Sequence, residues 1–476
     1  MTKGTLRTVN AVDLLLILLL SLSIRSQGQV LTLNNCRQLA IDNNKQLKAA
    51  TEQERTAFYQ KKEALMKFFP KISASGTYLH FNEDIHLISN SAIPSSITLP
   101  ALLGGMTLPV PNAITEGVYG LGEIDMSNIW LASVSVTQPI FAGGKIIAYK
   151  DLRNHAEKLA IAQKDTKLAD VIVEVDEAYW QVVSLSGKKK LAESYVDLMK
   201  KLNSDMEELE KEGMATKADR LSVNVKLNEA ELTHTKIENG LNLSKMLLCQ
   251  ICGIEFSSEL TLVDENKAIE NVPTVGTEYD IESSLSQRPE IKSLEAVVKI
   301  MDQQRKIARA EYMPTIGLST GYMLSNPNLH EGLQKSFSGN WHVGVSVNLQ
   351  INPFTSTSKY KVEQAETRKS QYELEDAKDK IRLQINQANY KLTEANRKIA
   401  SAIYNVEKAE ENLNYANLGF EEGVISSADV MAAYAAWVAA ESEHIDADID
   451  LKLCKLYLDR ALGSGLINDN ANQQLK

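Results

Sequence analysis

The sequence has few of the residues from which active sites and metal sites are built. Its 476 residues include only four cysteines and seven histidines. The histidines form neither a metal-binding spacing nor a nucleophile–base pattern; they are His80, His86, His155, His234, His330, His342 and His444. A glycine-rich phosphate loop and a Gly-x-Ser-x-Gly motif are also missing from the sequence. The sequence therefore predicts a protein that is not an enzyme, with no cofactor and no metal site.

Two of the cysteines, Cys249 and Cys252, have the spacing that zinc and redox sites use. They lie in the amphipathic run 241–254 without a second Cys/His pair nearby, so we expect two buried helical thiols instead. Cys36 follows Asn35 and lies beyond the N-terminal apolar run, so we do not expect it to carry a lipid.

Long apolar runs are missing after the N-terminus, which excludes transmembrane helices. At the N-terminus, Lys3 and Arg7 precede the apolar run 14–22, and Gly28 ends a cleavage site of small residues. Residues 1–28 therefore predict a secretory signal peptide, because the apolar run is too short to span a bilayer. An exported chain without membrane helices belongs to the periplasm, the exterior or the outer membrane.

The chain is also short of positive charge. Its formal net charge of −10 becomes −12 without residues 1–28, because three basic residues and one acidic residue leave with them. An acidic chain repels the phosphates of DNA and RNA, so no nucleic-acid partner is expected.

The sequence repeats itself at long range. Three landmarks recur in the same order: residues 212–219 at 422–429, residues 130–136 at 341–347, and residues 69–72 at 313–316. Matched landmarks in one order indicate a duplicated unit. We therefore expect a first repeat over residues 29–254, a connecting equatorial segment over 255–279, a second repeat over 280–462 and a tail over 463–476.

Each repeat contains a very long segment without helix breakers. Residues 146–211 and 356–421 contain no proline and very little glycine, and each predicts a helix of roughly 66 residues, about 100 Å long. Apolar residues of the second segment follow at steps of three and four, which indicates a left-handed coiled coil; they are Leu374, Ala377, Ile381, Ile385, Ala388, Leu392, Ala395, Ile399, Ala402, Val406, Ala409, Leu413, Ala416 and Phe420. The first segment repeats this stripe less regularly, at Leu159, Ala162, Thr166, Ala169, Val173, Leu191, Leu198, Leu202 and Leu209.

A glycine ends each long helix, and a second helix follows, so each repeat has a helical hairpin with a tip near residue 213 or 423. Each glycine is followed by a Thr or Ser and then an Asp at capping-box spacing, with Asp in place of Glu. The two sets are Gly213, Thr216 and Asp219, and Gly423, Ser426 and Asp429. These tips are either plain turns or docking sites, and their recurrence fits both interpretations.

Four short segments alternate apolar residues with small polar ones, which predicts strands. Two of them are 72–81 and 316–322, and the clearest alternation is at Trp130, Val134 and Val136 and at Trp341, Val343, Val345 and Val347. Strands of about 10 residues with one apolar face fit a transmembrane barrel with a wet interior. The alternative is a soluble sandwich, but four strands are few beside so much helix.

Four strands cannot close a barrel, and a bilayer does not tolerate an open sheet edge. The chain must therefore share one barrel with further copies of itself. Two copies would give about eight strands and a filled interior, whereas three would give about 12 strands and a lumen, and we favour three. The predicted fold is mainly helical and internally duplicated, with a long coiled-coil barrel of helices and four strands per chain in a shared trimeric β-barrel.

A long insertion separates the first two strands. Residues 83–122 are rich in Pro, Ser, Gly and Leu, and their counterpart in the second repeat is shorter. Such a loop is expected on the outer-surface side of a transmembrane barrel. The residues expected at the strand–helix junctions are Pro70, Pro139, Gly143, Gly144 and Pro314.

Three further segments carry distinctive sequence: LTLNNCRQLAIDNN over residues 31–44, QPIFAGGK over 138–145 and RPEIKSL over 288–294. Together with the duplication, they resemble the TolC-like outer membrane efflux family over essentially the whole mature length. The resemblance implies a homotrimer in outer-membrane lipid that extends into the periplasm. It also implies an exit duct of a tripartite export system, which docks through its helix tips on a periplasmic adaptor protein and an inner-membrane transporter.

The resemblance further implies a pore gate at the second tip, where relatives carry two aspartates. Asp429 matches the first of these, whereas the second falls at Ala432, so a gate here would rest on Asp429 alone. Three copies of Asp429 around one axis would attract cations and repel anions in a narrow pore. The alternative is that Asp429 only supports the start of its helix, as Asp219 would.

The exported substrate stays open at this point. Small-molecule efflux is favoured as the commoner role in the family, with type I protein secretion and metal efflux as alternatives. A periplasm-spanning coiled-coil scaffold is the non-channel alternative, but a scaffold has no need of lipid-facing strands. Adaptor choice is expected to depend on residues 211–221 and 421–431.

Overall fold

The structure is a computed structural model that describes residues 30–82, 85–86, 92, 94–98, 107–114, 116, 123–124, 127–256, 260–266, 280–328, 335–351 and 353–463. The predicted signal peptide lies outside these ranges, as do the tail beyond residue 463 and most of segments 83–122 and 255–279. The chain divides into two compact units. Unit 1 comprises Met1–Thr56, Lys158–Ala296 and Tyr372–Lys476, and unit 2 comprises Ala57–Glu157 and Val297–Gln371.

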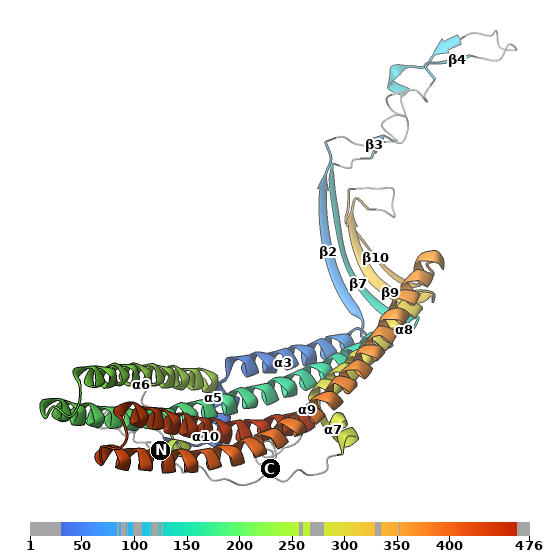
Figure 1. Cartoon of the computed structure of the whole chain (residues 1–476). Helices are drawn as coiled ribbons and strands as arrows, with labels where there is room; N and C mark the ends of the chain where they lie inside the picture. Colours follow the sequence, from blue (N-terminus) through green and yellow to red (C-terminus); the bar gives the residue numbers. More distant parts are fainter. Residues whose placement is uncertain are drawn as a thin grey trace, which may run out of the picture. The chain divides into compact units, whose positions relative to one another are not determined.

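Both predicted long helices are confirmed, as α5 (Lys145–Lys211) and α9 (Pro353–Glu421) (Figure 1). Helix α9 begins slightly earlier than predicted because Pro353 occupies its first position, where the missing N–H of a proline costs no hydrogen bond. The remaining helices are α2 (Leu33–Asn43), α3 (Lys45–Met66), α6 (Lys217–Cys252), α7 (Ile281–Gln287), α8 (Pro289–Ala310) and α10 (Ser427–Leu462).

Ion pairs give the lateral order of the four long helices in unit 1. Lys189 of α5 pairs with Glu238 of α6 at 2.8 Å. On the other side of α5, Lys188 pairs with Asp446 of α10 at 2.7 Å. Helix α10 in turn contacts α9 through Lys398 and Asp450, also at 2.7 Å. The order is therefore α6, α5, α10, α9, with α6 and α9 at the two ends.

Apolar side chains between these helices form the core of unit 1. On α9 the predicted coiled-coil seam is confirmed, since Ile385, Leu392 and Ala402 are among its most buried residues. On α5 the predicted stripe is too narrow. Leu191 and Leu198 are only half-buried, whereas the deepest side chains of α5 are Val171, Val175, Tyr179, Val182 and Met199. Because α5 has α6 on one side and α10 on the other, it buries more than a single seam.

The opening segment of each repeat caps the last helix of the same repeat. In the first repeat, Asn44 Nδ2 donates to the Ile251 carbonyl near the end of α6 at 3.0 Å. In the second, Arg288 Nη1 donates to the Ala461 carbonyl near the end of α10 at 2.8 Å. These bonds satisfy carbonyl groups that a helix end leaves without an internal partner.

Arg288 is also the buried centre of a charge cluster. Its Nε donates to Glu290 at 3.1 Å, and Glu290 pairs in turn with Arg460, which reaches Asp170 at 2.9 Å. Burial alone would raise the pKa of Glu290, but the hydrogen bond from Arg460 and the charge of Arg288 lower it below its ordinary value. The cluster therefore holds an ionised carboxylate inside unit 1.

Unit 2 contains an antiparallel sheet of four long strands in the order β10, β9, β7, β2 (Figure 1). Their bounds are β2 (Lys71–His80), β7 (Asn128–Ala142), β9 (Thr315–Asn326) and β10 (Ser338–Asn348). All four predicted strand segments are therefore confirmed. The register is continuous except between Pro139 and Phe141, where β7 bulges against β9.

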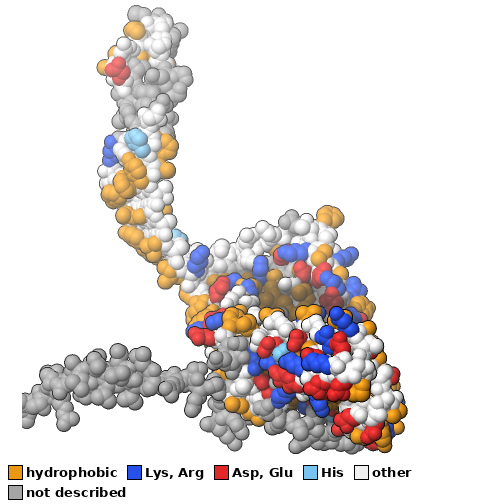
Figure 2. Space-filling view, turned by 60° about the vertical axis from the view of Figure 1, so that its left-hand side comes forward, with side chains coloured by type: hydrophobic (Ala, Val, Ile, Leu, Met, Phe, Trp, Pro, Cys, Tyr) orange, Lys and Arg blue, Asp and Glu red, His pale blue; other side chains and the backbone are white. Residues whose placement is uncertain are grey.

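The two faces of this sheet differ in polarity, as the alternation predicted. Val134 pairs with Tyr322, and Tyr322 pairs with Trp341, so these apolar residues share one face. On the other face, serine hydroxyls bond across strands: Ser73 to Ser135 and Ser75 to Ser133, each at 2.9 Å. Figure 2 shows hydrophobic side chains gathered along the strands on the face turned to the viewer.

Short strand pairs accompany the long sheet. In unit 1, β1 (Val30–Leu31) pairs in parallel with β8 (Thr261–Leu262). Within the predicted long loop, β3 (Ile85–His86) pairs with β6 (Glu123–Ile124), and β4 (Ser96–Thr98) pairs with β5 (Thr107–Pro109). The rest of that loop lies largely outside the described residues, so its predicted position stays a prediction.

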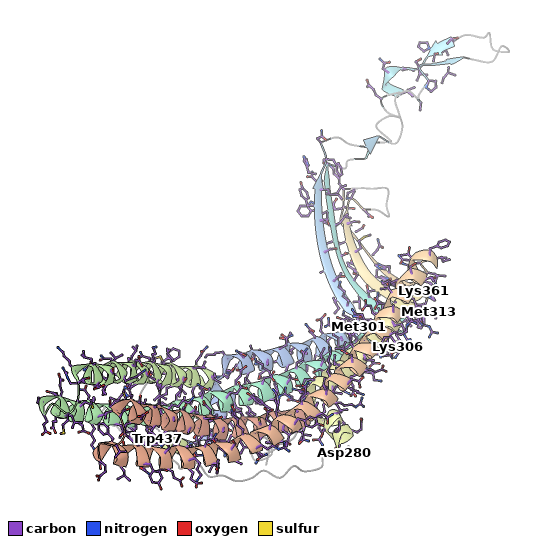
Figure 3. The ribbon with its side chains drawn as sticks, in the orientation of Figure 1. Asp280, Met301, Lys306, Met313, Lys361 and Trp437 are labelled. Atoms are coloured by element: carbon purple, nitrogen blue, oxygen red, sulfur yellow. The ribbon has the colours of Figure 1, made fainter. Side chains whose placement is uncertain are left out.

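Glycine is required where β7 passes into α5. Gly143 has a φ of 60°, and a Cβ on it would lie 2.6 Å from the Met313 Cβ and 2.7 Å from the Ala310 carbonyl. Met313 lies where α8 leads into β9 (Figure 3). Gly144 follows with a φ of 81°. The two glycines allow the chain to turn into α5 in contact with the end of α8.

The prolines of the predicted junctions have different positions. Pro70 comes directly before β2, and Pro314 directly before β9, as expected for a helix-to-strand junction. Pro139, in contrast, lies inside β7 at the register shift and not at the strand's end. A bulge accommodates the proline there because the missing N–H then interrupts no regular ladder bond.

Replacing Arg288 by alanine removes the donor to the end of α10 and one partner of Glu290. We expect the free energy of unfolding to fall by about 2 kcal/mol, because a half-buried carboxylate loses one of its partners and a helix end loses its donor. Calorimetry of the detergent-solubilised protein would show this as a lower Tm. Lys292→Ala, at an exposed position in the first turn of α8, is the control; equal Tm values for the two variants would contradict the capping role.

The same variant should show a characteristic pH dependence. The folded-state pKa of Glu290 is lowered, so its stabilising contribution is present above the ordinary value of 4.5 and is lost as the pH falls through the lowered pKa. The difference in Tm between the wild type and Arg288→Ala should therefore shrink as the pH falls below 4.5. A difference that stays constant from neutral to acid pH would count against the charge cluster as its source.

Candidate functional site

The two helix tips have the same backbone turn. Gly213 has a φ of 75° and Gly423 a φ of 74°, both in the left-handed region. The N–H of the next residue, Met214 or Val424, donates to the carbonyl five positions back at 2.8 Å in each tip. These are Schellman turns, which end a helix with its last carbonyl groups satisfied. The predicted glycine stops are confirmed in both repeats.

The first tip starts its second helix with a complete capping box. The Thr216 Oγ1 accepts from the Asp219 N–H at 3.2 Å, and the Asp219 Oδ2 accepts from the Thr216 N–H at 3.0 Å. Hydrogen bonds from the Thr216 hydroxyl and N–H lower the pKa of Asp219, which is exposed. The carboxylate therefore stays ionised at the positive end of α6.

The second tip is similar but not identical. The Ser426 Oγ accepts from the Asp429 N–H at 3.3 Å and donates to the Asp429 Oδ2 at 2.7 Å. Here the carboxylate is held by the hydroxyl of the N-cap residue. Asp429 is exposed in the first turn of α10, which places negative charge at the positive end of that helix.

A buried tip cluster joins the two hairpins. Its residues come from all four long helices and include Met199, Met206, Val223, Leu413, Val430 and Tyr434. The Tyr434 hydroxyl donates to Asn417 Oδ1 at 2.9 Å, and Trp437 of α10 packs against the same cluster (Figure 3). The cluster brings both predicted tip sets to the same end of unit 1. The predicted barrel residues belong to unit 2.

A groove beside the tips was not predicted from the sequence. It lies between α5, α6 and α10, has a volume of about 570 Å³, and is lined mainly by apolar side chains. They include Leu191, Tyr195, Ala230, Ile237, Ala428, Met431, Ala432 and Ala435. Alanines at steps of three and four on α10 are the signal that could have indicated a face of small side chains. Ala432, at the position where the resemblance implied a second aspartate, lines this apolar groove.

In the described part of the chain, no group of three or more His, Cys, Asp and Glu side chains is arranged to hold a metal ion. Every helix within the same ranges is too short or too polar to cross a bilayer.

Comparison with known proteins identifies the fold. The profile of the outer membrane efflux protein family matches residues 36–253 and 281–464. The protein CyaE of Bordetella pertussis is 21% identical over 347 residues, which is 72% of each chain. The outer membrane protein VceC of Vibrio cholerae has a TM-score of 0.70 at 16% identity, covering 91% of this chain and 96% of its own. The Campylobacter jejuni CmeC outer membrane channel has a TM-score of 0.73 at 14% identity, covering 93% and 88%.

The matched segments contain both helical hairpins and all four long strands, and they make up most of the sequence. By this match, the chain belongs to the outer membrane efflux protein family.

Proposed function

We propose that three copies of the chain form one exit duct in the outer membrane. The duct passively conducts small molecules, such as drugs or other toxic compounds, from an inner-membrane pump through the periplasm to the exterior. The observation that carries this proposal is the open sheet of unit 2, with one apolar and one serine-lined face. Such a sheet suits lipid on one side and water on the other.

The two edge strands of the sheet need pairing partners, which further copies of the chain would supply. Among the described residues, β2 and β10 each have a long neighbour on one side only. On the apolar face, Trp341 is 77% and Val345 68% exposed, so this face also lacks cover within the chain. In a bilayer, lipid covers the apolar face, but only another strand can satisfy the edge N–H and C=O groups. Placing β10 of one copy beside β2 of the next, with three copies, closes a barrel of about 12 strands.

The helices at the two ends of the lateral order carry exposed apolar stripes. The α6 stripe consists of Leu221, Val225, Leu232, Leu243 and Leu247, and the α9 stripe of Tyr372, Leu383, Tyr390, Tyr404 and Tyr415. Each set recurs on one side of its helix and is exposed. Exposed apolar stripes of this extent are typical of interaction surfaces. We assign the α6 stripe of one copy to the α9 stripe of the next.

The tips are the proposed contact with the rest of an export system. A periplasmic adaptor would dock on residues 211–221 and 421–431 and on the apolar groove beside them, and an inner-membrane transporter would supply the energy. The exposed side chains of Met214 and Val424 at the turns are suited to such a contact. Exchange of both tips with those of a related chain should transfer adaptor choice.

The mass of the particle extracted by detergent from an outer-membrane fraction tests the proposal. We expect a protein mass near three chains, each of 52.7 kDa before the signal peptide is removed. A monomer, or a protein found only in the soluble periplasmic fraction, would contradict a shared barrel and favour the scaffold alternative.

Tyr390→Glu tests the assignment of the α9 stripe. Tyr390 is 76% exposed, and a charge there would have to be buried between copies. We expect the trimer to dissociate at lower detergent stress, because each interface loses about 2 kcal/mol of apolar burial and gains an unpaired charge. Size-exclusion chromatography with light scattering measures the trimer fraction. Asn389→Glu, which adds the same charge on another exposed side of α9, should leave the trimer intact.

Asp429→Ala tests the proposed gate. If three Asp429 carboxylates ring a narrow aperture, their removal should raise single-channel conductance and lessen block by divalent cations several-fold. Planar-bilayer recordings measure both quantities. Asp219→Ala is the matched control, because Asp219 has the same first-turn position at the other tip. Equal effects of the two variants would contradict the gate and would mean that Asp429 only supports the start of α10.

A further inference from the structure

Three cysteines, Cys36, Cys249 and Cys252, lie in one buried cluster of the fold. Cys249 and Cys252 lie in the last turn of α6, and both are fully buried, as predicted. Cys36 of α2, far away in sequence, is equally buried in the same cluster of unit 1. Within the described ranges no group of three His, Cys, Asp and Glu side chains is suited to a metal ion, so metal binding does not explain the convergence.

Cys36 and Cys252 are in direct contact. The Cys252 Sγ donates to the Cys36 carbonyl oxygen at 3.5 Å. In the folded protein, hydrogen bonding from the Cys252 side chain lowers the pKa of Cys36, and the same interaction together with burial raises the pKa of Cys252. Cys36 is therefore the thiol that more readily becomes a thiolate.

The backbone around the two cysteines is held in place by independent contacts. Asn44 Nδ2 bonds the Ile251 carbonyl at 3.0 Å, directly before Cys252. On the other side of Cys252, Gly253 approaches α2 so closely that a Cβ there would lie 2.7 Å from the Asn43 Cβ. Because α2 and the end of α6 are already fixed against each other, a bond between the sulfurs needs side-chain rotation and little backbone movement.

We propose that Cys36 and Cys252 form a disulfide bond in the exported protein. The inference rests on the proposed outer-membrane location, since disulfides form and persist in oxidising compartments such as the periplasm. Both thiols are fully buried after folding, so the exchange takes place while the new chain is still open.

The oxidant is a protein disulfide of the thiol–disulfide oxidoreductase class. In the open chain either cysteine can react first; if it is Cys36, its thiolate attacks one sulfur of that disulfide, which gives a mixed disulfide and releases one thiolate of the oxidant. The Cys252 thiolate then attacks the Cys36 sulfur and displaces the second. The chain loses two thiol protons and two electrons and gains one S–S bond, while the oxidant takes up both electrons and becomes a dithiol.

The bond would close a loop of 216 residues between α2 and the end of α6. Cross-links that close long loops restrict the unfolded chain most strongly. The only strand pairing of the opening segment among the described residues is the two-residue contact of β1 with β8. A covalent link would therefore fix α2 to the end of α6.

Thiol counting on the protein from its native membrane tests the proposal. Cells are quenched in acid, and the protein is denatured in N-ethylmaleimide and digested for mass spectrometry. Of the four cysteines, we expect only Cys249 and Cys454 to be labelled, together with a reducible peptide pair that joins Cys36 to Cys252. Four labelled cysteines, or a link from Cys36 to Cys249, would overturn the assignment.

Cys249→Ser is the matched control, because it removes the neighbouring thiol of the same helix turn. This variant should keep the Cys36–Cys252 link and leave Cys454 as its one labelled cysteine. Fractionation of the same cells separates this inference from the proposed function. Outer-membrane protein with four labelled thiols would contradict the disulfide alone. If the protein is not in that fraction, the location fails, and thiol counting after refolding in a glutathione redox buffer decides on the disulfide by itself.

Discussion

A strand in a lipid bilayer must have partners for all of its backbone N–H and C=O groups, and the proposed assembly depends on this requirement. The described residues of one chain supply four long strands, with β2 and β10 at the edges of the sheet. Closure then has to come from identical neighbours, which pair the two edges head to tail. The strand β7 leads into α5 at Gly143, whereas α3 and α8 lead into β2 and β9 at Pro70 and Pro314. The exposed α6 and α9 stripes are the helical counterparts of the two sheet edges.

The two repeats share structural features, such as helix caps and turns, more closely than they share the residues that form them. Both repeats end their last helix with a left-handed glycine, Gly253 or Gly463, but an asparagine caps the first end and an arginine the second. Both tips use a Schellman turn and an aspartate, yet only the first forms a complete capping box. A partner that docked on the tips, as proposed, would meet two related but distinct surfaces. The apolar groove between α5, α6 and α10 adds a third element to that end of unit 1.

Much of this architecture could be predicted from the periodicity of apolar residues and from the positions of glycine and proline. The steps of three and four on α9 gave its buried seam, and the alternation at Trp341 to Val347 gave a strand with one apolar face. The stripe on α5 was less accurate because periodicity assumes one packing face, and α5 has two neighbouring helices. Pro139 was expected at a strand–helix junction but lies in a bulge inside β7. The bulge could not be predicted because it depends on the register of the neighbouring strand. The meeting of Cys36 with Cys252, and the groove that Ala432 lines, depend on contacts between distant segments, which one sequence alone does not encode in any local pattern.

Cross-linking of the two sheet edges tests the shared barrel most directly. Each chain would carry two introduced cysteines in a background without the native thiols. One would replace Ser73 or Ser75 on β2, and the other would replace Gly344 or Ser346 on β10. Oxidation in isolated outer membranes should then link β2 of one copy to β10 of the next for the pairs in register, and the largest covalent product should contain three chains. Bonds formed only within one chain, or a ladder that ends at two chains, would contradict the account.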